Sequence, residues 1–212
     1  MNIAIFGATG GTGRALVEQA LAQGHTVTAF ARNPSALTIT HPCLSVVQGD
    51  VLDPARVEAA VAGQDAVLNS LGMKPGTHAA VTSEGTHNII AAMQKFGVRR
   101  LITQSSLPVA AVDGHPHELP WLFRIILSLA APLRAIFRDK VRQEQIIQHS
   151  GLEWVIVRPA TLTDGARTGT YRVGMPLKVS LGSRISRADV AEFMLKQVVN
   201  NTYLHQVPRL SY

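Results

Sequence analysis

Short apolar runs alternate with amphipathic stretches along most of the chain. Residues 2–6 form a continuous apolar run, and in residues 12–23 Leu16, Ala20 and Leu21 are spaced to share one face of a helix. Apolar runs without polar alternation are typical of strands that are buried on both faces. The same alternation predicts further strands at residues 26–31, 44–48, 66–69, 100–104 and 154–157, and further helices at residues 54–61, 79–96 and 187–199.

This order of elements predicts an α/β protein. Strands that alternate with helices form a parallel sheet, because each helix returns the chain to the edge where the next strand begins. A length of 212 residues fits one domain. We therefore expect residues 1–212 to form a single Rossmann-like domain, a doubly wound parallel sheet with helices on both faces. We expect C-terminal segments, at about residues 105–185, to form the substrate pocket.

Residues 121–149 change from apolar to polar in the middle. Arg124, Pro132 and Arg134 interrupt the apolar part, residues 121–137, so its apolar runs are too short to cross a membrane. We expect an apolar helix there, a separate polar helix at residues 138–149, and short strands and loops at residues 170–185. No membrane association is expected.

Composition and charge narrow the classes of partner. Hydrophobic residues make up 46% and charged residues 16% of the chain, which is typical of a globular protein. The net charge of +6 suits an anionic partner, but the basic residues are scattered and only 5% of residues are aromatic. A small anionic molecule is therefore favoured over nucleic acid. The single cysteine, Cys43, excludes an internal disulfide, and the N-terminus lacks a signal-peptide pattern, so we expect a cytoplasmic protein.

A glycine-rich turn gives the strongest chemical signal. It reads Gly7-Ala8-Thr9-Gly10-Gly11-Thr12-Gly13, directly after the first strand and at the start of the first helix. One glycine allows the tight turn, a second lets the backbone approach a diphosphate, and a third lets the helix pack closely on the strand. The diphosphate then lies on the free amides of the helix N-terminus. The turn therefore predicts a dinucleotide site formed by Gly7, Thr9, Gly10, Gly11, Thr12 and Gly13.

The end of the second strand indicates which dinucleotide binds. A site for NAD carries Asp or Glu there, about 20 residues after the turn, to bind the ribose hydroxyls. The strand ends instead in Phe30-Ala31-Arg32-Asn33-Pro34, with no carboxylate. The Arg32 guanidinium suits a 2′-phosphate, so we expect NADP(H), although Arg32 could also be a solvated surface residue.

Other candidates follow the later strands, at the edge of the sheet where ligands bind. Asp50 and Val51 are expected beside the adenine, and Leu71 and Gly72 beside the rest of the dinucleotide; Asp50 could equally be a turn residue. The candidates near the nicotinamide and the acceptor are Ser105, Ser106, Pro159 and Thr161. The hydroxyls of Ser105, Ser106 and Thr161 could equally cap strand ends and turns.

The usual proton donor of short-chain dehydrogenases is missing. In a Tyr-x-x-x-Lys pair the tyrosine protonates the carbonyl oxygen and the lysine lowers its pKa. Tyr171, Tyr203 and Tyr212 have no lysine four positions later, and Ile136 stands four positions before Lys140. Carbonyl reduction by this route is disfavoured. His115-Pro116-His117-Glu118 lacks a third ligand at a suitable spacing, so we expect no metal site.

The chain resembles the atypical short-chain dehydrogenases with an NAD(P)H-binding, NmrA-like fold, and among them the biliverdin reductase B (flavin reductase) branch. The resemblance extends over most of the chain. Besides the glycine-rich turn, the segments that carry it are Gly49-Asp50-Val51-Leu52, Ala62-Gly63-Gln64-Asp65-Ala66-Val67, Ser83-Glu84-Gly85, Asn88-Ile89, Ser150-Gly151-Leu152 and Thr168-Gly169-Thr170-Tyr171.

The resemblance implies an NADPH-dependent reductase that uses a flavin, a linear tetrapyrrole such as biliverdin, or a quinone-like molecule as a substrate. A flavin accepts hydride at a ring nitrogen and can take its proton from water, which agrees with the missing tyrosine. By resemblance, the cofactor positions are Gly7, Thr9, Gly10, Thr12, Gly13, Arg32, Asp50, Val51, Leu71 and Gly72, and Ser106 is the serine near the nicotinamide. The branch is expected to be monomeric, or dimeric.

The chain departs from this branch in two places. Pro159-Ala160-Thr161 stands where the branch has Pro-Pro-His, so flavin is favoured over biliverdin. Residues 118–137 are longer and more apolar than their equivalent, which we expect to reshape the mouth of the substrate pocket. Two other functions are compatible with the missing tyrosine. One is a non-catalytic, NADP(H)-sensing regulator of the NmrA type, and the other, less favoured, is an isomerase or epimerase.

Overall fold

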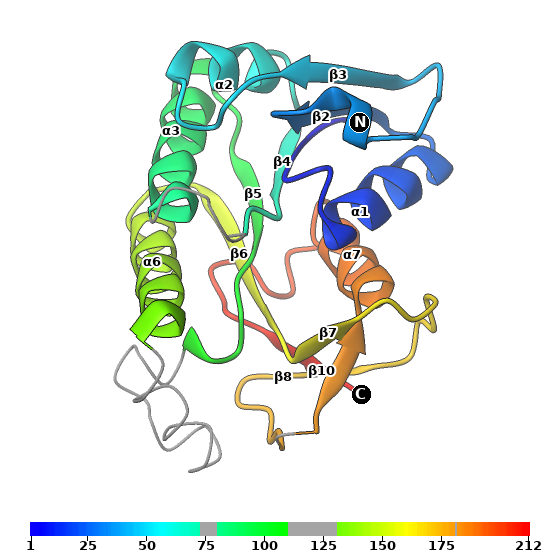
Figure 1. Ribbon diagram of the computed structural model, residues 1–212, viewed down its shortest axis with the longest axis vertical. Coiled ribbons are helices and arrows are strands. Elements are labelled where there is room, and N and C mark those ends of the chain that lie inside the picture. Colours follow the sequence, from blue (N-terminus) through cyan, green and yellow to red (C-terminus); the bar gives the residue numbers. More distant parts are fainter. Residues whose placement is uncertain (73–79, 110–130, 181) are drawn as a thin grey trace.

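A computed structural model describes residues 1–72, 80–109, 131–180 and 182–212. Its main feature is an eight-stranded sheet in the order β3-β2-β1-β4-β5-β6-β10-β8 (Figure 1). The strands of this sheet are β1 (Asn2–Phe6), β2 (Thr26–Ala31), β3 (Leu44–Gln48), β4 (Ala66–Asn69), β5 (Arg100–Gln104), β6 (Glu153–Pro159), β8 (Arg172–Gly174) and β10 (Arg209–Ser211). All neighbouring pairs are parallel except β10 and β8. The fold is therefore the Rossmann-like sheet that the sequence predicts.

Helices cover both faces of this sheet (Figure 1). One face carries α1 (Gly11–Ala22) and α7 (Arg187–Lys196), and the other carries α2 (Pro54–Val61), α3 (Val81–Phe96) and α6 (Ala131–Gln148). Alternation along β1 separates two cores, because Ile3 and Ile5 face α1 and α7 whereas Ala4 and Phe6 face α2 and α3. A strand buried on both faces is continuously apolar for this reason.

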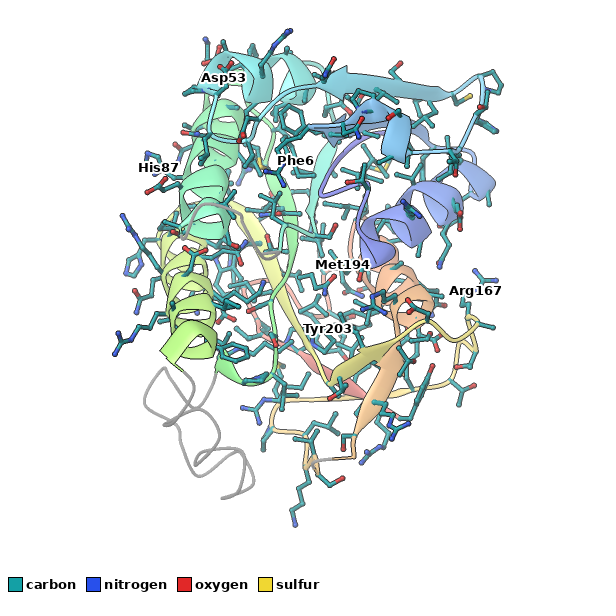
Figure 2. All side chains as sticks on the ribbon, viewed as in Figure 1. Phe6, Asp53, His87, Arg167, Met194 and Tyr203 are labelled. Carbon is teal, nitrogen blue, oxygen red and sulfur yellow. The ribbon has the colours of Figure 1, made fainter. Side chains whose placement is uncertain are left out.

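Local signals explain where several helices begin and end. Asp53 accepts hydrogen bonds from the backbone amides of the first turn of α2, and Pro54 occupies the first helical position. Gly97 ends α3 in the left-handed conformation, with φ of 70°. His87 lies on the outer face of α3, where Figure 2 shows it directed away from the sheet.

The polar part of α6 is where the sequence prediction was wrong. The expected boundary between an apolar helix ending at residue 137 and a polar helix starting at 138 does not exist, because α6 runs unbroken from Ala131 to Gln148. Gln143 and Glu144 are buried on the same helix as Phe137 and Ile147. Buried polar side chains interrupt the helical spacing of apolar residues, so the sequence pattern wrongly indicates that one helix ends and another begins. Residues 121–130 lie outside the described residues.

The C-terminal region differs from the prediction in smaller ways. The last helix, α7, ends at Lys196, three residues before the predicted end. Strand β10 was missed because it has three residues and a polar sequence; it is defined only by pairing with β6 and β8. Between β6 and α7, the strands β7 (Thr161–Thr163) and β9 (Arg184–Ser186) form a separate parallel pair.

Candidate functional site

A cavity lies at the carboxyl ends of β1, β2 and β4. Strands β2 and β4 flank β1 on opposite sides, so the chain leaves β1 and β4 in opposite directions and opens a crevice between them. The cavity has a volume of about 190 Å³. Its lining residues are Gly7, Thr9, Gly10, Phe30, Ala31, Arg32, Val51, Ser70, Leu71, Gly72 and Val81.

The glycine-rich turn forms one wall of this cavity with its backbone. Gly7 has φ of 77°, and a Cβ atom there would lie 2.7 Å from the Ser70 carbonyl oxygen. A Cβ atom on Gly13 would lie 2.1 Å from the Gly7 carbonyl oxygen, so α1 packs directly against the turn. At Gly10 the nearest protein atom to such a Cβ is 3.3 Å away. A side chain at Gly7 or Gly13 would clash with the protein backbone itself. Gly10 instead leaves space open on the side of the cavity.

The N-terminus of α1 offers an anion site behind this turn. Gly10 is the N-cap, and the helix has no side-chain cap and no acidic residue in its first turn. The first amides of a helix have no intrahelical acceptor, and the helix dipole adds positive potential. Thr12 is buried in this first turn and Gly11 is exposed. The arrangement fits the diphosphate of a dinucleotide.

Arg32 extends this wall at the end of β2. Its side chain is exposed, and it lines the cavity together with Phe30 and Ala31. None of the described residues that line the cavity is an aspartate or a glutamate. The end of β2 therefore presents a guanidinium where an NAD site presents a carboxylate.

Val51 and Asp50, which follow β3, are placed differently. Val51 is buried and lines the cavity. Asp50 is exposed, its carboxylate accepts the Leu52 amide at 3.0 Å, and it is not among the described lining residues. The Asp50 carboxylate therefore forms a turn within its own segment, which is the alternative that the sequence left open.

A buried asparagine fixes the turn after β4. The Asn69 side-chain oxygen accepts the Leu71 amide at 3.0 Å, and its amide group donates to the Thr86 hydroxyl at 2.9 Å. Leu71 is thereby held at the cavity. Ser70, which also lines it, donates from its hydroxyl to the Phe6 carbonyl at 3.0 Å. Sequence reasoning overlooked Ser70, although its position directly before Leu71 was a usable signal.

Ser105, at the end of β5, belongs to a buried polar cluster. Its hydroxyl donates to the Glu144 carboxylate, and Glu144 pairs with Arg158 through an Nη2–Oε2 distance of 2.5 Å. Ser105 and Glu144 are both 2% exposed. The Ser105 hydroxyl is therefore engaged inside the protein, whereas Ser106 is partly exposed. Glu144 was missed because its carboxylate contacts residues distant in sequence.

Lys140 lies one helical turn before Glu144 on α6. Burial lowers the pKa of Lys140 to about 8, and the carboxylates of Glu144 and Asp139 act in the opposite direction. Asp139 itself accepts the backbone amides of Thr82 and Ser83 at 3.0 and 3.2 Å, at the start of α3. A lysine with this pKa is largely protonated at neutral pH but can lose its proton in mild base.

The segment after β6 carries the remaining candidates. Pro159 is buried and pairs with Leu210 in β10. Thr161 is exposed, begins β7 and pairs with Arg184. Among the described residues that line the cavity, neither Pro159 nor Thr161 is present.

All three tyrosines are engaged around α7. The Tyr171 hydroxyl donates to Glu192, and burial together with this bond raises the Tyr171 pKa above its usual value. Tyr212 donates to Asp189 at 2.6 Å, and the Tyr203 ring lies 5.5 Å from that of Phe193. None of the three tyrosines is among the described residues that line the cavity.

Two other features concern only the part of the chain that the structure describes. The His115–His117 motif lies outside it, and within it no group of three histidine, cysteine, aspartate or glutamate residues could hold a metal ion. Within the same residues, no helix is both long enough and apolar enough to cross a membrane.

Comparison with known proteins identifies the family. A family model described as NAD(P)H-binding matches residues 7–201, which include the glycine-rich turn and strands β2 to β9. The chain belongs to this NAD(P)H-binding family. An uncharacterized chloroplastic protein of Arabidopsis thaliana is 32% identical over 210 residues, covering 93% of this chain and 72% of that protein. An uncharacterized Mycobacterium tuberculosis protein is 29% identical, and the match covers 15% of its length.

Solved structures of similar proteins agree with this family. ChuY from Escherichia coli O157:H7, described as an anaerobillin reductase, has a TM-score of 0.80 and 28% identity, and the match covers 99% of this chain and 96% of ChuY. A short-chain dehydrogenase/reductase from Veillonella parvula, solved in complex with NADP, has a TM-score of 0.79 and 17% identity, covering 100% and 94% of the two chains. The second likeness concerns the fold alone. Together these findings place the chain in an NAD(P)H-binding family that has a reductase among its structural relatives.

Proposed function

We propose that this NAD(P)H-binding protein is an NADPH-dependent reductase that transfers hydride to a flavin or a similar conjugated acceptor. The observation that carries the proposal is the cavity where the chain direction reverses between β1 and β4. It joins the bare glycine turn to Arg32, and its described lining contains no carboxylate. A guanidinium without a competing carboxylate favours the 2′-phosphate of NADPH over the ribose hydroxyls of NADH.

The described residues have distinct roles in this proposal. Gly7 and Gly10 receive the diphosphate, Arg32 binds the 2′-phosphate, and Leu71 borders the path toward the nicotinamide. When bound, the nicotinamide supplies the hydride. Ser106 and Thr161 border the acceptor, in a pocket formed by residues at about 105–185 of one 212-residue domain. The Ser105 hydroxyl donates to the Glu144 carboxylate, so in this proposal Ser105 positions Glu144 and does not contact the acceptor.

The acceptor follows from the missing proton donor. Because the hydroxyl of Tyr171 donates to Glu192 and that of Tyr212 to Asp189, a carbonyl substrate would lack the usual acid. A flavin takes its proton from water, so proximity and orientation are sufficient. The likeness to ChuY supports a reductase and adds anaerobillin to the acceptors worth testing. Thr161 replaces the histidine of the biliverdin reductase B branch, which favours flavin over biliverdin.

The proposal is tested by following NADPH oxidation at about 340 nm without oxygen, with FMN, riboflavin, biliverdin and anaerobillin as separate acceptors. Turnover of any of these acceptors supports the reductase. If the protein binds NADPH but turns over none of the four acceptors, the reductase proposal is refuted and a non-catalytic NADP(H) sensor is favoured.

The Arg32→Ala variant tests the cofactor preference separately. Loss of a charge-assisted contact to phosphate is expected to raise the Kd for NADPH by about 10- to 100-fold and to leave the Kd for NADH within about twofold. Arg138→Ala, which removes an exposed arginine from α6, is the matched charge control. An equal loss of NADPH and NADH affinity in Arg32→Ala would overturn the assignment to the 2′-phosphate.

A further inference from the structure

Arg187 lies on the glycine-rich turn although it is distant in sequence. A Cβ atom on Gly11 would lie 2.5 Å from Arg187 Cδ and 2.8 Å from Arg187 Nε. Gly11 is the first residue of α1, and Arg187 is the first residue of α7. The absence of a side chain at Gly11 is therefore what lets the arginine lie across the start of α1.

The packing of α7 on α1 fixes the direction of this side chain. Gln19, two turns further along α1, donates from its amide to the Ala188 carbonyl at 2.9 Å. Ser186 caps α7 by accepting the Asp189 amide at 3.0 Å. The start of α7 is thus held beside the middle of α1. From there the Arg187 side chain runs back to Gly11, toward the end of α1 that borders the cavity.

The carboxylate that pairs with Arg187 lies largely in solvent. The Arg187 Nη1 atom lies 2.6 Å from Asp164 Oδ1, but the Asp164 side chain is 87% exposed. An ion pair with such an exposed carboxylate is weak and easily exchanged. On the other side, the first turn of α1 has neither a side-chain cap nor an acidic residue. A guanidinium and a helix N-terminus, which both favour anions, therefore converge on one place.

We propose that Arg187 binds the diphosphate of the dinucleotide from above Gly11, exchanging its ion pair with Asp164 for the phosphate oxygens. This inference rests on the proposed dinucleotide site and adds a residue from the other end of the chain to it. Arg187 and Arg32 then bind different parts of the cofactor. Arg187 binds the group that NADPH and NADH share, and Arg32 binds the 2′-phosphate that distinguishes them.

The experiment measures the Kd of the full chain for NADPH, NADH and 2′-AMP by calorimetry. Arg187→Ala is expected to weaken NADPH and NADH equally, by about 10- to 100-fold, and to leave 2′-AMP, which has no diphosphate, within about twofold. Arg167→Ala is the control, because Arg167 is an exposed arginine three residues from Asp164 that Figure 2 shows near α7. A Kd for both dinucleotides within twofold of the Arg167→Ala value would overturn the proposal, as would an equal loss of 2′-AMP affinity.

Asp164→Asn provides a second test that does not depend on the stability of α7. Removing the competing carboxylate is expected to tighten NADPH and NADH by about two- to fivefold, and to have no effect in the Arg187→Ala background. Tightening that persists without Arg187 would contradict the exchange. These binding readouts are separate from the reductase proposal, since a sensor that binds NADPH without turnover gives the same affinities. If the wild-type chain binds neither dinucleotide, both the role of Arg187 and the reductase proposal are refuted.

Discussion

Asp189 connects three segments at the C-terminal side of the sheet, and its removal tests how the region around Arg187 is held. The Asp189 side chain is fully buried. One carboxylate oxygen accepts the backbone amides of Thr168 and Gly169, both at 2.8 Å. The other accepts the hydroxyls of Thr168 at 2.8 Å, Ser186 at 3.1 Å and Tyr212 at 2.6 Å. These bonds hold the pKa of Asp189 below its usual value, although burial acts in the opposite direction.

The Asp189→Asn variant keeps the shape of the side chain and removes its charge. The asparagine oxygen can still accept the two backbone amides, and its NH₂ group then faces the hydroxyls. Hydrogen bonds to a charged group contribute about 1.5–3 kcal/mol and neutral ones about 0.5–1.5 kcal/mol. The two weakened backbone bonds account for about 2–3 kcal/mol of unfolding free energy, and the lost Tyr212 bond adds about 1.5–3 kcal/mol. For a chain of this size, Tm should fall by about 7–24 °C.

The assay is thermal unfolding by circular dichroism at neutral pH and at acid pH. Because the pKa of Asp189 is lowered in the folded protein, its stabilisation is fully present above the ordinary value of about 3.9 and is lost as pH falls through the lowered folded value. The difference between wild type and variant should therefore shrink below about pH 4. Glu18→Gln, at an exposed position on α1, is the control. A Tm within 1 °C of wild type at neutral pH, or a difference that is independent of pH, would refute the reasoning.

Three further predictions concern the site. Gly10→Val should abolish NADPH binding and Gly10→Ala should only weaken it, because the space beside Gly10 belongs to the cofactor; unaffected binding in folded Gly10→Val contradicts this. Thr161→His should raise the rate of biliverdin reduction relative to that of FMN, and an unchanged ratio in steady-state assays argues against the role of this position. Lys140 should titrate near pH 8 in NMR spectra of ¹³C-labelled lysine, and Glu144→Gln should lower that pKa further because it removes negative charge; a pKa near 10.5 excludes the burial of Lys140.

Much of the sheet could be predicted from local sequence. Strands β1 to β5 begin and end at the predicted residues, because each is a short apolar run bounded by turn residues. The start of α2 is equally local, since Asp53 and Pro54 cap it. Predictions were wrong where burial and polarity disagree. In α6, Gln143 and Glu144 are polar but buried, and no periodicity of hydrophobic residues reveals them.

The residues of the candidate site also differ in whether local sequence could predict their roles. The glycine-rich turn and Arg32 could be predicted because their chemistry follows from residue type and from position at a strand end. Ser105 shows the limit of that argument, since its hydroxyl donates to a glutamate 39 residues away and is not free at the edge of the sheet. Val81, from the start of α3, lines the cavity without any motif that marks it.

Local sequence was sufficient to predict strands β1 to β6, the glycine-rich turn and the absence of a Tyr-x-x-x-Lys pair. These features depend on residues that are neighbours along the chain, and local geometry and spacing are sufficient to define them. Only the tertiary structure brought Arg187 to Gly11, Glu144 to Ser105, and β10 to the edge of β6. Such contacts join segments between 39 and 176 residues apart, and they arise because helices and strands must pack their buried faces together.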